Sequence, residues 1–164
     1  MTNTVYLSLG SNLGPRERQL RSAIHCLKRI GRVVNVSSFY ETEPVEVTEQ
    51  PWFLNCAVSV ETTENPERMM RTVLEMEREM GRERTQKKGP RTIDIDILLF
   101  GDQVVESGVV TVPHPAMQKR RFVLEPLAEI APEARHPVLK KTVRELLAEL
   151  PEGQAVRRID SRTE

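Results

Sequence analysis

Two carboxylates stand inside an apolar run, in the segment TIDIDILLF at residues 92–100. β-branched and hydrophobic residues of this kind predict a buried strand, where an unpaired charge is costly. Residues two apart along a strand point to the same face, so Asp94 and Asp96 form a side-by-side pair while the isoleucines between and beside them face the core. Two carboxylates held so close repel each other, and a divalent cation is a common way to settle the repulsion.

A cation-rich segment leads directly into this pair. Its six cations are Arg78, Arg82, Arg84, Lys87, Lys88 and Arg91. Such a segment beside two carboxylates suits phosphoryl transfer, because catalysis there depends on positioning and on neutralising phosphate charge. Mg²⁺ takes one or two carboxylates and completes its octahedron with water and phosphate oxygens, so Asp94 and Asp96 need no protein cage, and two ions can share them.

A purely structural interpretation of these residues stays open. The charged segment could be a solvated loop, and the aspartates could pair with cations across the sheet, with Arg91 as one partner. His114, which stands between two prolines, could cap a loop or contact a phosphate. Cys26 and Cys56 lie in apolar surroundings, which favours packing over metal or redox chemistry. No P-loop, dinucleotide-binding or zinc motif competes.

The spacing of hydrophobic residues and the positions of glycine and proline predict the helices and strands that must position these residues. They are a strand over 4–9, a helix within 15–31, strand-like runs over 32–42 and 51–62, a helix from Asn65–Pro66 to Gly81, and the aspartate strand. The order β-α-β-β-α-β predicts a ferredoxin-like α+β fold, an antiparallel sheet with both helices on one face and a C-terminal extension. A short strand pair is expected within 102–112 and a final helix over 142–150.

Composition sets the broad class. A chain of 164 residues with 38% hydrophobic content suits a single domain over 1–164, in which we expect 151–164 to be a flexible tail. The 24 Lys and Arg balance the 24 Asp and Glu, so no global charge favours nucleic acid or a membrane as partner. The absence of a long apolar run or signal segment indicates a cytoplasmic protein.

Several separated segments together resemble one family. In order they are YLSLGSNLG, SSFYETEP, FLNCAV, GRERTQKKGPRTIDIDILLFG and TVPHPAMQKRRFVLEPLAEIAPE. They are similar to the 6-hydroxymethyl-7,8-dihydropterin pyrophosphokinases of folate biosynthesis, over a stretch from about Val5 to about Leu150. The resemblance implies the same ferredoxin-like fold and a reaction in which ATP donates its β,γ-pyrophosphoryl group to the pterin hydroxymethyl oxygen, leaving AMP.

The resemblance also implies roles for residues. Asp94 and Asp96 would hold two Mg²⁺ ions on the ATP triphosphate, and Arg82 and Arg91 would join them in catalysis. The residues implied for ATP are Glu77, Arg82, Arg84, Arg91, Ile97, Thr111, His114 and Arg120. Those implied for the pterin are Gly10, Thr42, Val45, Phe53, Asn55 and Phe122. Phe53 and Phe122 would sandwich the ring, and Asn55 would hydrogen-bond its edge.

The partners expected are therefore ATP and a reduced pterin, for a monomer that can associate with other folate enzymes. Two other functions remain as alternatives. A small ferredoxin-like module could bind RNA through the basic segment, although zero net charge and the lack of an aromatic-rich sheet motif disfavour it. An Mg²⁺-dependent nucleotidyl transferase would release pyrophosphate, whereas the pyrophosphokinase releases AMP.

Overall fold

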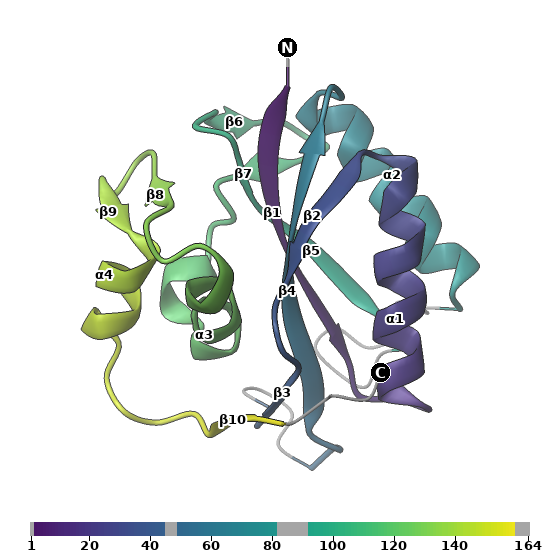
Figure 1. Cartoon of the computed structure of the whole chain (residues 1–164), viewed down its shortest axis with the longest axis vertical. Helices are drawn as coiled ribbons and strands as arrows, with labels where there is room; N and C mark the ends of the chain where they lie inside the picture. The colour runs from purple at the N-terminus through teal and green to yellow at the C-terminus, as the bar shows by residue number, and fades with distance from the viewer. Residues whose placement is uncertain (1, 45–48, 82–91, 160–164) are drawn as a thin grey trace.

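The centre of the protein is an antiparallel sheet, seen in a computed structural model that describes residues 2–44, 49–81 and 92–159. Its strands are β1 (Asn3–Ser11), β2 (Arg32–Val36), β3 (Tyr40–Thr42), β4 (Phe53–Thr62), β5 (Asp94–Phe100) and β10 (Val156–Arg158). The strand order is β10-β3-β4-β1-β5, and β2 pairs with β4 farther along the same edge than β3 (Figure 1). The two long central strands, β1 and β4, therefore form the base on which both edges are built.

Two helices cover one face of the sheet, as the sequence predicted. They are α1 (Arg16–Cys26), extended by the 3₁₀ turn η1 (Leu27–Arg29), and α2 (Pro66–Glu79) (Figure 1). The main core lies between these helices and the sheet and includes Leu20, Met69, Val73 and Met76, each with no exposed surface. The Asn65 side chain caps α2 by accepting a hydrogen bond from the Arg68 N–H at 2.8 Å. The predicted ferredoxin-like arrangement is thus confirmed.

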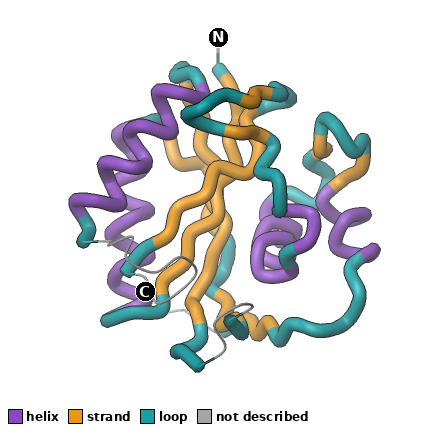
Figure 2. The backbone as a smooth tube through the Cα atoms, turned by 180° about the vertical axis from the view of Figure 1, so that it is seen from behind, coloured by secondary structure: helices purple, strands orange, loops and turns teal. Residues whose placement is uncertain are grey.

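The opposite face is covered by α3 (Arg121–Ile130), and α4 (Val143–Glu149) packs against α3 on the side away from the sheet (Figures 1 and 2). A second core packs there around Leu98, Leu124 and Leu127. The helix α4 was predicted, and Thr142 and Glu145 form a capping box at its start. No helix was predicted at α3, because Pro126 lies inside it and proline disfavours a helix interior. Burial of its apolar face against the sheet outweighs that cost.

The C-terminal segment also differs from expectation. Residues 156–158 form β10, which pairs with β3, and the Ile159 N–H donates to the Phe39 carbonyl oxygen at 2.9 Å. Arg157 adds an ion pair with Glu41 at 2.5 Å. This part of the expected tail is held in a defined conformation because it pairs with β3, a strand more than a hundred residues earlier in the chain. Local pattern in a short polar stretch could not reveal such a partner.

The remaining elements are small. The expected pair within 102–112 is the hairpin of β6 (Val105–Glu106) and β7 (Thr111–Val112), and a second hairpin joins β8 (Arg135–His136) to β9 (Lys141–Thr142). The 3₁₀ turn η2 (Met117–Lys119) precedes α3. Burial raises the pKa of the Cys56 thiol to about 12, which fits a packing role.

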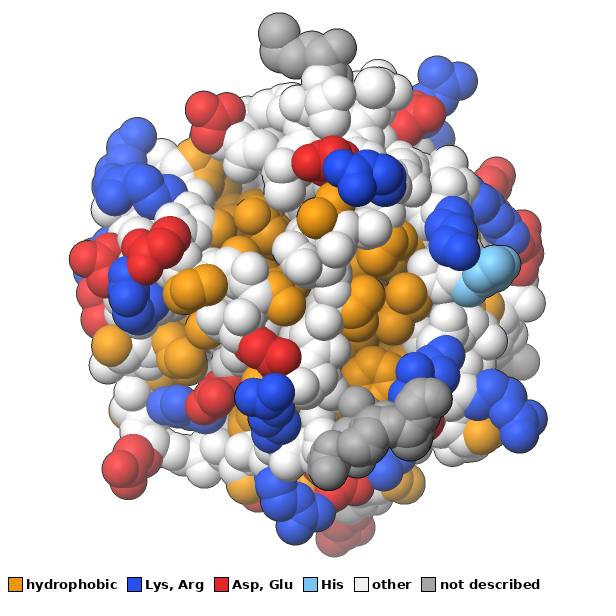
Figure 3. Space-filling view, viewed as in Figure 1, with side chains coloured by type: hydrophobic (Ala, Val, Ile, Leu, Met, Phe, Trp, Pro, Cys, Tyr) orange, Lys and Arg blue, Asp and Glu red, His pale blue; other side chains and the backbone are white. Residues whose placement is uncertain are grey.

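The surface gives little further indication of partners. Figure 3 shows hydrophobic side chains in the middle of one face, with charged side chains of both signs around them. Within the described ranges, no helix combines the length and the apolar character needed to cross a bilayer.

Candidate active site

Three neighbouring strands place a row of functional side chains across one end of the sheet. Gly10 on β1 lies opposite Asp94 on β5 and, on its other side, opposite Asn55 on β4. Directly opposed residues of antiparallel strands share a face, here the face covered by α3. Adjacent strands are about 4.8 Å apart, so the backbones at Asp94 and Asn55 are separated by about 10 Å.

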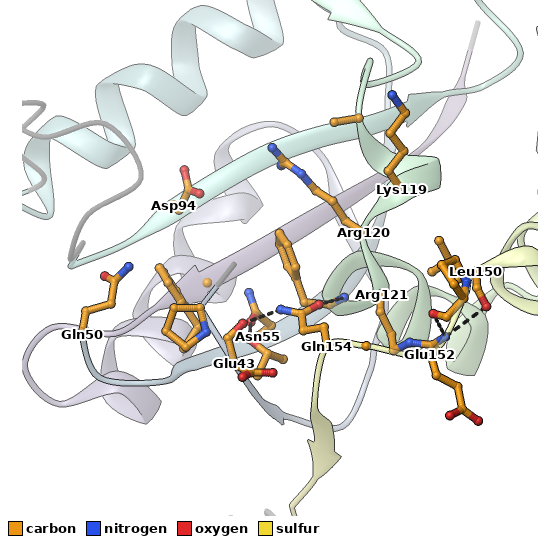
Figure 4. A pocket seen from close by; sticks show the side chains of 18 residues that line it. Glu43, Gln50, Asn55, Asp94, Lys119, Arg120, Arg121, Leu150, Glu152 and Gln154 are labelled. Carbon is orange, nitrogen blue, oxygen red and sulfur yellow. Dashed lines mark hydrogen bonds between the residues drawn. The ribbon is translucent and has the colours of Figure 1, made fainter. Parts of the chain in front are cut away.

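A cavity of about 480 Å³ lies over this row, between the sheet, α3 and the C-terminal segment (Figure 4). Seven of the residues expected from the sequence line it: Gly10, Thr42, Phe53, Asn55, Asp94, Arg120 and Phe122. Residues from the first, middle and last parts of the chain thus meet at one site. The cavity is large enough for a drug-sized ligand.

Asn55 forms the polar floor of the cavity. Its Oδ1 accepts a hydrogen bond from the Thr42 hydroxyl at 2.5 Å, and its Nδ2 donates to the Leu9 carbonyl oxygen at 3.3 Å. An amide can make four hydrogen bonds, so these two leave one N–H donor and one acceptor lone pair for a ligand. Gly10 makes room for this amide, because a Cβ there would lie 2.5 Å from Asn55 Nδ2.

The two aspartates stand on the same face of β5, as predicted. Both are partly exposed, while Ile93 and Ile95 are buried on the opposite face. Among the residues that the structure describes, no three His, Cys, Asp or Glu side chains are grouped so as to hold a metal ion by themselves. The pair nevertheless fits Mg²⁺, which takes few protein ligands when phosphate oxygens complete its coordination.

His114 extends the carboxylate end of the site. Its Nε2 lies 3.9 Å from Asp96 Oδ1, and its Nδ1 accepts a hydrogen bond from the Ala116 N–H at 3.1 Å. Burial, and next the positive charge of Arg120, lower the pKa of His114 to about 4. The imidazole is therefore neutral at physiological pH, with its proton on Nε2, facing the carboxylate.

Three residues expected to contact ATP are placed differently from the cavity residues. Glu77 is buried on α2, and its Oε2 accepts the Ile95 N–H at 2.7 Å, so it holds the backbone of the aspartate strand. The Ile97 side chain belongs to the main core and can approach a nucleotide only through its backbone. Thr111 lies on β7, half-buried. The structure does not bring these three into the cavity, and Asp96 and His114, beside its carboxylate end, do not line it either.

Four further predicted residues lie outside the described residues: Val45, Arg82, Arg84 and Arg91. Their roles stay predictions from the sequence. Conversely, sequence reasoning missed the C-terminal wall of the cavity, which includes Pro151 and Gln154. No local signal marks a lone glutamine in a polar segment as a site residue.

The fold and the site together define an α+β domain with a small-molecule cavity beside a carboxylate pair. Residues 6–132 match the family model described as 7,8-dihydro-6-hydroxymethylpterin-pyrophosphokinase (HPPK). The chain belongs to this family. The family assignment made from the sequence is therefore confirmed.

Relatives of two lengths support the assignment. The chain is 47% identical to the 2-amino-4-hydroxy-6-hydroxymethyldihydropteridine pyrophosphokinase of Bacillus subtilis, with 79% of each chain covered. It is 40% identical to the Pseudomonas aeruginosa protein of that name, covering 92% of this chain and 94% of the relative. It is also 44% identical to "Folic acid synthesis protein fol1" of Schizosaccharomyces pombe, but spans only 21% of that longer protein and 93% of its own length.

The fold is shared with a solved structure. The Plasmodium falciparum HPPK-DHPS wild type with pteroate superposes with a TM-score of 0.75 at 20% identity, over 91% of this chain and 42% of that one. At this identity the likeness concerns the fold alone.

Proposed function

We propose that the protein transfers the β,γ-pyrophosphoryl group of ATP to the hydroxymethyl oxygen of 6-hydroxymethyl-7,8-dihydropterin, giving the pterin diphosphate and AMP in folate biosynthesis. The observation that carries the proposal is the single row from Asn55 to Asp94 beneath one cavity. Its amide end offers a donor and an acceptor to a heterocycle, and its carboxylate end offers charge for a metal and phosphates. A backbone separation of about 10 Å between the two ends suits a bicyclic ring with a short alcohol arm.

The pterin ring would lie between Phe53 and Phe122, which line the cavity from β4 and from α3. Flat apolar faces contribute buried area and stacking, and the Asn55 amide reads the polar ring edge. Arg120, whose guanidinium carbon lies 5.5 Å from the centre of the Phe122 ring, places a cation beside that ring and toward the carboxylate end. The ring and the arm are thus held by different groups.

ATP and Mg²⁺ would be used at the carboxylate end, where Asp94 and Asp96 would hold two ions. Bound there, Mg²⁺ supplies charge neutralisation for the triphosphate and the transferring group. The neutral His114 offers an Nε2–H donor next to Asp96, and Arg120 offers a full charge to phosphate oxygens. β5 pairs with β1, on which Gly10 would lie beneath the pterin ring, so the position of the two aspartates relative to the ring is fixed by the sheet. The aspartates would thereby set the position at which the pterin alcohol meets the β-phosphorus.

The wider setting of the enzyme belongs to the same proposal. We place it in the cytoplasm, as a single domain that acts as a monomer and can associate with other folate enzymes. The Plasmodium falciparum protein carries the double name HPPK-DHPS, which supports such an association.

The direct test is to incubate the purified protein with ATP, Mg²⁺ and the pterin alcohol and to separate the nucleotide products. We expect AMP and a pterin diphosphate in equal amounts, and no AMP when Mg²⁺ is chelated. Release of pyrophosphate with a nucleotidylated pterin would favour the nucleotidyl transferase instead. The absence of any pterin-dependent product would contradict both reactions.

Stacking by the aromatic pair predicts a selective loss. Phe122→Ala should weaken pterin binding by more than about 1 kcal/mol, roughly fivefold, because a desolvated aromatic face is lost. Binding of a non-hydrolysable ATP analogue should stay nearly unchanged, as calorimetry with each ligand separately would measure. Trp52→Ala is the matched control, since Trp52 is 38% exposed and does not line the cavity. Equal losses for both ligands would indicate general unfolding and reject the stacking role.

A further inference from the structure

The helix α3 begins without a cap of its own. Arg120 occupies its N-cap position, and no side-chain hydrogen bond is made from there to the first turn. The Phe122 N–H, one of the donors that a helix start leaves without an intrahelical partner, instead donates to Gln154 Oε1 at 3.2 Å. A residue 32 positions later thus supplies the missing cap.

The other end of the same amide holds the opposite wall of the cavity. Gln154 Nε2 donates to the Glu43 carbonyl oxygen at 2.5 Å, just after β3 (Figure 4). The neighbouring Ala155 N–H donates to Glu43 Oε1 at 3.0 Å, and Ala155 O accepts the Glu43 N–H at the same distance. Gln154 therefore spans the cavity rim from the segment after β3 to the start of α3.

We propose that Gln154 is a positioning residue for the pterin, acting through Phe122. Its carbonyl oxygen fixes the backbone at Phe122 and with it the angle at which that ring meets the ligand. Its amide nitrogen ties this position to the β3 side of the cavity. The proposal rests on the proposed function, because it requires the pterin to stack on Phe122.

The rest of the C-terminal segment is held independently of Gln154. Arg121 Nη2 donates to the Pro151 carbonyl oxygen at 3.1 Å, and β10 continues the sheet beyond β3. Removal of the Gln154 amide should therefore leave the segment in place and loosen only the start of α3. This separates a positioning role from a general contribution to folding.

The test uses the isosteric change Gln154→Met, which keeps side-chain length and removes both hydrogen bonds. We expect pterin affinity to fall by up to about fivefold, the size of a typical lost helix cap and no more than the loss from Phe122→Ala, with affinity for the ATP analogue within about twofold of wild type. Gln154→Glu keeps an oxygen that accepts the Phe122 N–H but loses the donor to the Glu43 carbonyl oxygen, so it should recover part of the pterin affinity. Gln103→Met, on the turn after β5, is the matched control and should change neither ligand.

A double-mutant cycle separates an action through Phe122 from a direct contact with the ligand. In a Phe122→Ala background, Gln154→Met should cost no further pterin affinity. Additive losses, equal losses for the Met and Glu variants, or no loss in the Met variant would overturn the proposal while leaving the proposed function intact. Failure of the wild-type protein to bind the pterin alcohol would overturn both.

Discussion

Asp96→Asn is expected to lower turnover by at least about 10³-fold, or about 4 kcal/mol in the barrier, while the fold is retained. Asn keeps the size of the side chain and removes its charge, so a metal on β5 would lose one of its two carboxylates. Asp96 is partly exposed and lies opposite Ser8 of β1, where a neutral amide can be accommodated. The loss should therefore concern the reaction and not the packing.

Rapid-quench measurement of AMP formation across a range of Mg²⁺ concentrations would quantify this effect, with circular dichroism as the check on folding. A metal ligand predicts that excess Mg²⁺ restores part of the rate, whereas a salt-bridge partner predicts no dependence on Mg²⁺. Asp102→Asn is the matched control, because Asp102 is exposed in the turn that follows β5. A well-folded Asp96→Asn enzyme with near-normal turnover would refute the metal assignment.

Asn55→Leu should cost about 100-fold in pterin affinity and leave the ATP analogue bound as before. A site built to hydrogen-bond a polar edge discriminates strongly, because removing its partner leaves the ligand's buried donor and acceptor unpaired. The change also removes the hydrogen bonds of the Asn55 amide with the Thr42 hydroxyl and the Leu9 carbonyl oxygen, so some loss of stability is expected as well.

Binding must therefore be measured by calorimetry well below the unfolding temperature of the variant. Asn35→Leu, an exposed amide on β2 of the same sheet, is the matched control and should bind both ligands normally. If Asn55→Leu lost the nucleotide and the pterin equally, the residue would support the fold and would not recognise the ring.

The parts of the site that could be predicted from the sequence were those with a strong local pattern. The alternation in TIDIDI, the first part of the segment, indicates which side chains there face the core, and it placed Asp94 and Asp96 on one face. Asn65, Pro66 and Gly81 bound α2 by known capping preferences, and Gly81 has a positive φ of 88°. In both cases the residues themselves carry the conformational preference.

What could not be predicted depends on distant partners. The helix α3 forms despite Pro126 because its apolar face is buried against the sheet. The sequence around α3 contains no signal for that contact, because the strands involved come from earlier parts of the chain. The hydrogen bond from the Ile95 N–H to Glu77 is likewise a contact between α2 and the edge of β5. The family resemblance supplied the pterin and ATP roles, which the residues alone had left open beyond a metal and phosphates.

Asp94, Gly10 and Asn55 lie side by side on three paired strands, so the sheet fixes the distance between the carboxylate end and the amide end of the site. Its two ends are joined by main-chain pairing across β1, and the spacing between paired strands hardly varies. Gly10 lies between the two ends and has no side chain that could occupy the space above the sheet. We therefore expect strong discrimination against pterin alcohols in which the reacting oxygen lies at a different distance from the ring. Discrimination should be weaker between substituents on ring edges away from Asn55.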